Sequence, residues 1–257
     1  SNSKKAPFNI FLADIVFFIS KLHKKMIQDE DLAPKTIPVF LSKTEKLLEK
    51  LRSMSAEQLQ HMYRCNDKIL AENIKRIETM NLYENLSPAL FSYSGLAFQH
   101  LSATSLCQDE LDYLQEHFRI LSGFYGVLKP MDGITPYRLE MLSVFPDGSN
   151  LYDYWNDALY RELSDNVIIN LASEEYSRCI KDYLQENDRM IHIVFGEFKN
   201  GKLITKATKA KMARGDMIWY MAQNHITNPE DIKKFSEHYR YAEELSDDTH
   251  FVFVGQE

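Results

Sequence analysis

Short runs of consecutive apolar residues predict buried strands. The stretch Ile15–Ser20 reads IVFFIS, Asn166–Ala172 reads NVIINLA and Phe251–Val254 reads FVFV. Runs of about four to eight residues, rich in β-branched and aromatic side chains, are typical of strands that are covered on both faces. Residues 89–94 form a weaker strand candidate. These segments predict a sheet in the interior of the protein.

Apolar residues spaced three and four positions apart predict helices between these strands. The clearest helix covers Asp109–Leu121, and Gly123 stands where a left-handed C-terminal cap is expected. Ser55 and Gln58 have the spacing of a capping box, which places the start of another helix at Ser55. Further helices are expected over residues 39–51, 69–77, 151–163 and 209–224.

A β-hairpin is predicted over Arg189–Thr208. Two β-rich runs flank the dipeptide Asn200-Gly201. This dipeptide accepts the positive φ angles of a type I′ turn, the tight turn that joins antiparallel strands.

Helical and strand segments follow one another from residue 15 to residue 257 without a linker, a repeat or a low-complexity block. This order predicts an α/β protein of mixed α+β character, in which helices surround a mixed sheet. A single domain over residues 15–257 is expected. Residues 1–14 are interpreted as an expression remnant, Ser1 and Asn2, followed by an N-terminal extension.

Composition excludes several classes of protein. Hydrophobic residues make up 44% of the chain and charged residues 26%, which is ordinary for a globular protein and argues against disorder. Cys65, Cys107 and Cys179 are far apart and odd in number, so reduced cysteines in a cytoplasmic protein are expected rather than a disulfide framework. A redox-sensing thiol is the alternative. No run of about 18 apolar residues predicts a membrane span.

Charge is distributed unevenly along an acidic chain. The formal net charge is −7, yet residues 196–215 hold six basic residues against one acidic residue. Residues 228–257 hold eight acidic residues against three basic ones. This asymmetry permits a local basic surface for a polyanion, and a solvated hairpin with a solvated tail is the alternative.

Standard catalytic and phosphate-binding motifs are absent from the sequence. It contains no G-x-G-x-x-G or Walker loop, no G-x-S-x-G elbow and no H-E-x-x-H pair. None of the eight histidines has another histidine three or four positions away, so no helical metal face is expected. We therefore assign no catalytic residue, metal or cofactor from the sequence.

Two glycines follow the clearest predicted helix in the sequence ILSGFYGVLKP, residues 120–130. Gly123 and Gly126 lie three apart and would turn the chain tightly. A helix restarting near Val127, beside Lys129, would give a helix-hairpin-helix element that grips phosphates through backbone amides. An ordinary helix cap and turn is the alternative.

The segment PYRLEM, residues 136–141, places Arg138 and Glu140 two positions apart, on the same side of an extended chain. These two residues could pair with each other, bind a ligand or support a cleft. As an enzyme site, they would line a pocket with a lysine and with three further polar residues: Tyr137, Glu174 and Glu175.

Basic residues are concentrated where the predicted hairpin leads into a helix, in the sequence KATKAKMAR of residues 206–214. Lys211 and Arg214 share one face of that helix, apart from its apolar stripe. Basic side chains at a helix N-terminus oppose the helix dipole, at a cost of a few tenths of a kcal/mol each, roughly. Contact with phosphates would explain why the charge is kept there.

Several of these segments together resemble the YaaA peroxide-stress family. They read LSGFYGVLKPMD, PYRLEM, NVIINLASEEY and KMARGDM at residues 121–132, 136–141, 166–176 and 211–217. Residues 152–155 and 63–68 add support, and the resemblance extends from about residue 15 to the C-terminus. One departure is the family's Ser-Pro-Ala-Lys after the first strand, because Ser20–Lys25 lacks the proline. Either Lys24 or Lys25 could correspond to the family lysine.

The resemblance implies a bacterial cytoplasmic protein that is made under hydrogen-peroxide stress and limits damage from free iron. It also implies a non-standard α/β fold with a basic cleft, where a helix-hairpin-helix-like element binds double-stranded or branched DNA with little regard to sequence. A monomer without a membrane partner is expected. With the charge pattern, the resemblance favours these candidate DNA-binding residues: Gly123, Gly126, Lys129, Arg138, Lys206, Lys209, Lys211 and Arg214.

Three functions compete at this point. The first is a DNA-binding protein of the oxidative-stress response. The second is an enzyme of unknown reaction with a polar site around Arg138 and Glu140. The third is iron sequestration by carboxylates, which the acidic C-terminal stretch permits although no ligand spacing supports it.

Overall fold

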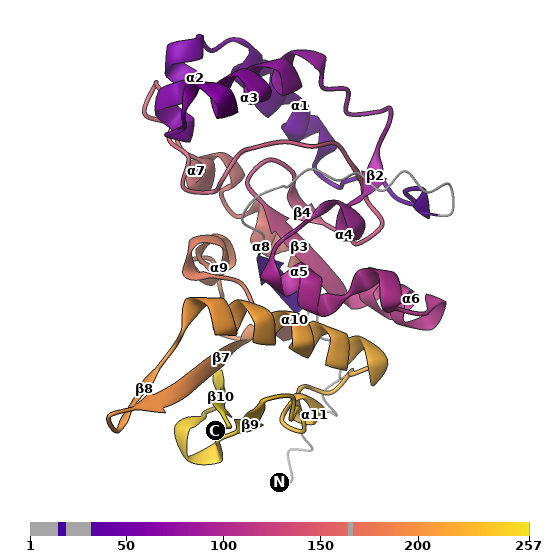
Figure 1. Ribbon diagram of the computed structural model, residues 1–257, viewed down its shortest axis with the longest axis vertical. Coiled ribbons are helices and arrows are strands. Elements are labelled where there is room, and N and C mark those ends of the chain that lie inside the picture. Colours follow the sequence, from indigo (N-terminus) through magenta and orange to yellow (C-terminus); the bar gives the residue numbers. More distant parts are fainter. Residues whose placement is uncertain (1–14, 19–31, 164–166, 257) are drawn as a thin grey trace, which may run out of the picture.

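A mixed eight-stranded sheet crosses the molecule (Figure 1). The computed structural model describes residues 15–18, 32–163 and 167–256. The strand order is β4-β3-β1-β6-β7-β10-β9, and β8 pairs with the far end of β7. The strands of this sheet are β1 Ile15–Phe18, β3 Phe118–Ser122, β4 Gly126–Leu128, β6 Val167–Asn170, β7 Arg189–Lys199, β8 Lys202–Ile204, β9 Tyr239–Tyr241 and β10 His250–Gly255.

The centre of the sheet is parallel and its edges are antiparallel. Strand β1 pairs in parallel with β3 and β6, β6 with β7, and β7 with β10. Strands β4, β8 and β9 join as antiparallel partners. Two short strands, β2 Ser87–Pro88 and β5 Gly133–Ile134, pair with each other outside this sheet. The predicted mixed α/β class is confirmed.

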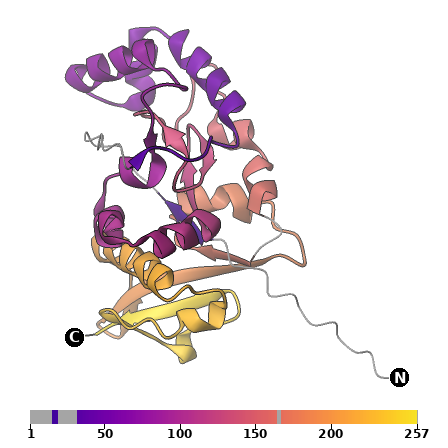
Figure 2. The ribbon, with the colours of Figure 1, turned by 90° about the vertical axis from the view of Figure 1, so that its right-hand side faces the viewer.

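Helices cover both faces of the sheet and form a cap at one end (Figures 1 and 2). Helices α5, α6 and α10 lie on one face and α8 and α9 on the other, while α1–α3 form the cap. The helices are α1 Leu41–Arg52, α2 Ala56–Tyr63, α3 Asp67–Thr79, α4 Ala89–Ser92, α5 Leu96–Leu101, α6 Gln108–His117, α7 Leu151–Trp155, α8 Ala158–Leu163, α9 Glu174–Lys181, α10 Ala207–Gln223 and α11 Pro229–Ile232. Among the described residues, no helix is long and apolar enough to cross a membrane.

Local signals predicted much of this arrangement. The Ser55 capping box is present, with the Gln58 amide donating to Ser55 Oγ and the Ser55 amide to Gln58 Oε1. The predicted segment 151–163 is helical but broken, because Asn156 has a φ of 49° and separates α7 from α8. The strand expected over residues 89–94 is wrong, since α4 occupies most of that stretch.

The helix expected over Asp109–Leu121 ends earlier than its apolar spacing suggests. Helix α6 stops at His117, and Phe118–Ser122 is strand β3, with all five positions buried. Because β3 lies between β1 and β4, both of its faces need apolar side chains. The apolar residues of this strand also fit the helical spacing, so the pattern did not mark the boundary between α6 and β3.

The expected helix-hairpin-helix element at Gly123 and Gly126 is wrong. Strands β3 and β4 form an antiparallel β-hairpin in which Leu121 pairs with Val127, so no helix restarts there. Gly126 supplies a left-handed φ of 77° for the turn. At Gly123, an added Cβ would lie 2.6 Å from the Leu139 carbonyl oxygen, so the glycine permits close packing of two backbone segments.

Candidate nucleic-acid interface

The turn between β3 and β4 is enclosed by its neighbours. The Trp155 indole donates to the Gly123 carbonyl oxygen at 3.0 Å, and the Thr44 hydroxyl donates to that of Phe124 at 3.1 Å. Ser122 Oγ accepts from the backbone amides of Phe124 and Tyr125. These amides are therefore already satisfied inside the protein, and the turn offers no open cradle for a phosphate.

Lys129 and Arg138 take part in local packing, and Arg138 contacts the cap. The backbone amide of Lys129 donates to Asp132 Oδ2 at 2.8 Å, and its side chain is half-buried. The Arg138 guanidinium lies over the Tyr63 ring, 5.6 Å from its centroid, and donates to the Tyr63 carbonyl oxygen. Within the described ranges Arg138 and Glu140 form no ion pair, so the expected pairing of these two residues is wrong.

The β7–β8 hairpin projects from the body of the molecule as a two-stranded arm (Figure 1). Asn200 and Gly201 have φ angles of 52° and 73°, as a type I′ turn requires, so the predicted hairpin is confirmed. The register places Lys199 directly opposite Lys202, and both side chains are exposed. In the part of the chain that the structure describes, neither lysine forms an ion pair.

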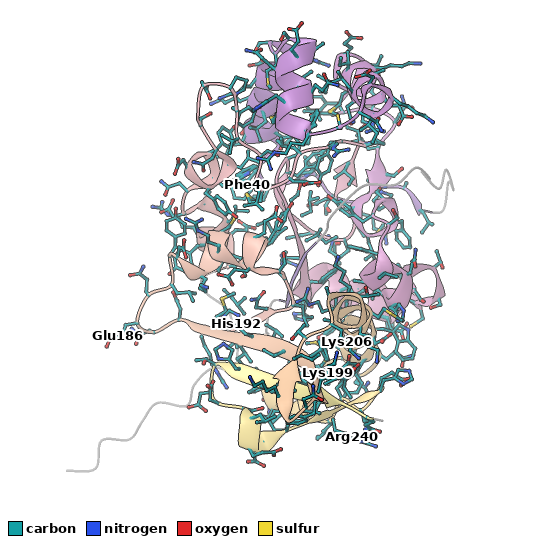
Figure 3. The ribbon with its side chains drawn as sticks, turned by 60° about the vertical axis from the view of Figure 1, so that its left-hand side comes forward. Phe40, Glu186, His192, Lys199, Lys206 and Arg240 are labelled. Atoms are coloured by element: carbon teal, nitrogen blue, oxygen red, sulfur yellow. The ribbon has the colours of Figure 1, made fainter. Side chains whose placement is uncertain are left out.

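A carboxylate organises two further lysines at the base of this arm. Lys206 Nζ lies 2.5 Å from Glu197 Oε2, and Lys209 Nζ lies 2.5 Å from Glu197 Oε1. Hydrogen bonds from these ammonium groups hold the pKa of Glu197 below its usual value. Lys211, two positions after Lys209 on α10, is exposed and has no ion-pair partner among the described residues. The basic arm, as defined here, comprises Lys199, Lys202, Lys206, Lys209 and Lys211; Figure 3 labels Lys199 and Lys206.

Arg214 does not join the exposed lysines of the basic arm. The residue is half-buried, its Nε is buried without a hydrogen-bond partner among the described residues, and burial lowers its pKa. The eight predicted DNA-binding residues therefore fall into separate groups. The structure brings Lys206 and Lys209 together on Glu197 and leaves Lys211 exposed on α10. Gly123, Gly126, Lys129, Arg138 and Arg214 have other surroundings.

Comparisons with known proteins place the sequence in a family. Residues 16–245 match the family model described as "Peroxide stress protein YaaA". The chain belongs to this family. It is 50% identical to a UPF0246 protein of Agathobacter rectalis, over 90% of this chain and 95% of that protein. UPF0246 proteins of Desulfitobacterium hafniense and Lachnoclostridium phytofermentans are 46% and 44% identical, over 90% and 91% of this chain and 94% of each relative.

The YaaA match includes the whole basic arm and also the segment proposed above as an enzyme site. In that segment Tyr137 is buried. Its hydroxyl forms hydrogen bonds with Ser122 Oγ at 2.6 Å and with the Tyr93 hydroxyl at 2.7 Å. Burial raises the pKa of Tyr137 to about 12. Glu175 Oε1 accepts from the Leu142 amide at 3.3 Å, so this segment does meet the start of α9.

Carboxylates near α9 have local partners rather than an arrangement suited to a metal. Burial raises the pKa of Glu175, and the nearby Glu140 carboxylate adds to that effect. Glu174 pairs with Lys181 at 2.5 Å. Within the described residues, no group of three or more histidine, cysteine, aspartate or glutamate side chains could hold a metal ion.

Lys199 and Lys202 were not among the candidate binding residues expected from the sequence. Both were counted in the basic stretch, but positions were ranked by their closeness to recognised motifs. The Asn200-Gly201 turn contains the signal that could have found them, because a two-residue turn pairs the residue before it with the residue after it. The ion pairs of Glu197 with Lys206 and Lys209 span nine and twelve positions and had no sequence signal.

Proposed function

We propose that this YaaA-family protein binds DNA through its basic arm as part of the peroxide-stress response. The observation that supports the proposal is the pairing of Lys199 with Lys202 on an exposed, projecting hairpin. Like charges directly opposite each other destabilise a β-hairpin. A polyanion bound to the arm removes this repulsion, because its phosphates neutralise both ammonium groups.

The shape of the arm suits a nucleic-acid backbone. A two-stranded β-ribbon is narrow enough to enter the major groove of a duplex, which is about 12 Å wide. Lysine is a flexible point charge that contacts phosphates without reading the bases. Binding by the arm therefore depends on phosphate spacing and groove shape, with little preference for base sequence, in double-stranded or branched DNA.

The acidic character of the whole chain does not oppose DNA binding by the basic arm. The net charge is −7, but Glu197 is the only acidic residue among residues 196–215. Exposed charges interact over about 10 Å at an ionic strength of about 0.1 M, so a bound phosphate responds mainly to the arm. Bound protein would cover the DNA and thereby limit iron-dependent oxidative damage to it.

The direct test compares two sets of lysine variants in fluorescence anisotropy with a labelled duplex. We expect the double variant Lys199→Ala/Lys202→Ala to lose about tenfold in affinity on every sequence tested, because two phosphate contacts are removed. Lys75→Ala on α3 is the matched control, since Lys75 is exposed on the cap away from the arm (Figure 1). Equal affinities for wild type, control and double variant would contradict the proposal.

A further inference from the structure

A pocket of about 290 Å³ lies beside the base of the basic arm. Residues from α5, α10, β7 and the β9–β10 edge line it, among them His100, Asp216, Glu197, Lys209 and Tyr239. Its size is at the lower end of the range of about 300–1,000 Å³ for small-molecule sites. It therefore admits a molecule of mononucleotide size or smaller, rather than a large cofactor.

One wall of the pocket contains a histidine fixed by a carboxylate. His100 Nδ1 lies 2.8 Å from Asp216 Oδ1. An ionised carboxylate only accepts hydrogen bonds, so Nδ1 carries the proton and Nε2 is the nitrogen left for a ligand. Within the described ranges Nε2 has no hydrogen-bond partner.

Tight contact between the two helices fixes this histidine in place. His100 belongs to α5 and Asp216 to α10, and the residue before Asp216 is Gly215. An added Cβ at Gly215 would lie 2.1 Å from the Ala97 carbonyl oxygen, so the helices meet backbone to backbone. The imidazole is therefore held before any ligand arrives, which lowers the entropic cost of binding.

The opposite wall presents hydrogen-bond donors. Both carboxylate oxygens of Glu197 are occupied, one by Lys206 and one by Lys209. The Lys209 ammonium has three donors, and one of them serves Glu197. Burial raises the pKa of Tyr239, which keeps its hydroxyl protonated and able to donate. Glu197 carries one negative charge against the two ammonium groups of Lys206 and Lys209, so the charge left over at this wall is positive.

We propose that this pocket binds a small phosphate-bearing molecule, of the size and chemistry of a nucleoside monophosphate. Lys209 and His100 hold its phosphate: the Lys209 ammonium group donates a charge-assisted hydrogen bond to one phosphate oxygen, and a hydrogen bond joins His100 Nε2 to another. The rings of His238 and Tyr239 line the pocket and offer faces for a planar base. Lys209 belongs to both the pocket and the basic arm, but binding of the small molecule in the pocket does not require DNA binding.

Isothermal titration calorimetry of the full chain tests the proposal with three probes: adenosine monophosphate, adenosine and inorganic phosphate. We expect the monophosphate to bind, and the other two to bind more weakly because each lacks half of the contacts. His100→Gln should weaken monophosphate binding at least about tenfold, since the hydrogen bond at Nε2 is lost together with the ring that Asp216 orients. Lys75→Ala, on the cap and outside the pocket, should leave monophosphate binding unchanged.

Asp216→Asn serves as a second variant in case His100→Gln folds poorly. The amide keeps the shape of the aspartate but can turn either its oxygen or its nitrogen towards Nδ1, so it no longer fixes which nitrogen of His100 carries the proton, and monophosphate binding should weaken here too. No detectable heat with millimolar adenosine monophosphate would overturn the proposal. So would equal affinities of wild type and a folded His100→Gln variant.

Competition with duplex DNA separates this inference from the proposed function. Adenosine monophosphate binding that persists in a protein without DNA affinity would overturn the DNA proposal and support the pocket. If the pocket instead binds a phosphate of the DNA backbone, duplex DNA should displace the monophosphate. The His100→Gln variant should then also bind DNA more weakly. That result would overturn the assignment of the pocket to a small molecule.

Discussion

Lys199 and Lys202 lie directly opposite each other across the β7–β8 hairpin, with only Asn200 and Gly201 between them. Both side chains are exposed on an arm that projects from the sheet. An unliganded hairpin is destabilised by this arrangement, whereas a hairpin bound to phosphates is not. The pair therefore connects the stability of the arm to its proposed binding function.

Lys202→Glu should stabilise the protein and weaken DNA binding at the same time. The substitution replaces a repulsive cross-strand pair by an attractive one with Lys199, which contributes about 0.2–1 kcal/mol. It also places a negative charge where a phosphate would bind. Urea denaturation and fluorescence anisotropy on the same preparation measure the two effects. Lower stability, or DNA affinity equal to that of wild type, would contradict this account of the arm.

Gly123→Ala should reduce stability without removing DNA binding from the folded fraction. Its new Cβ would lie 2.6 Å from the Leu139 carbonyl oxygen, and backbone that must shift costs about 1–3 kcal/mol. Gly148→Ala is the comparison, because Gly148 has a φ of 81° but open space around it. We expect the larger loss at Gly123 in urea denaturation. Loss of DNA binding by folded Gly123→Ala would restore a binding role for this turn.

Acidification should cost stability through His117. The side chain is 4% exposed, and burial is the main cause that lowers its pKa. A histidine whose pKa is lower in the folded state gives its full stabilisation above the unfolded pKa of about 6.5 and loses it as the pH falls below that value. His117→Gln should therefore lose less stability than wild type between about pH 7.5 and pH 5.5. If the urea midpoint falls equally in wild type and in His117→Gln over this pH range, His117 is not a source of the acid sensitivity.

The cysteines should differ in reactivity towards thiol reagents. Cys107 is exposed at the start of α6, whereas Cys179 is buried and its pKa is raised by burial to about 12. The thiolate is the reactive form, so native protein should be modified at Cys107 and protected at Cys179. Peptide mass spectrometry before and after unfolding in urea measures this difference. Rapid modification of Cys179 in native protein would contradict the buried placement.

Local chemistry made parts of this fold predictable. The Asn200-Gly201 turn and the Ser55 capping box each depend on residues within a few positions, and both are present. The run Val167–Asn170 is a strand because its apolar side chains lie in the centre of the sheet. In such cases the residues that determine the structure are neighbours in the sequence, so a pattern of a few positions contains the necessary information.

Other features depend on contacts that a sequence pattern does not contain. Phe118–Ser122 became a strand because β1 and β4 pair with it, although its spacing continued that of α6. Lys211 and Arg214 were expected on one exposed face of α10. Arg214 is half-buried because the covered side of α10 is wide and also includes Gly215 and Ile218. The charge pattern therefore located the basic stretch but did not separate its exposed members from its buried ones.

The salt dependence of DNA binding tests the basic arm most directly. The affinity of wild type and of Lys199→Ala/Lys202→Ala for one labelled duplex would be measured from about 50 to 200 mM salt. Each neutralised phosphate contributes about 0.9 to the slope of log affinity against log salt, so the double variant should have a slope smaller by about two units. Parallel slopes, or no binding by wild type at the lowest salt, would contradict the account.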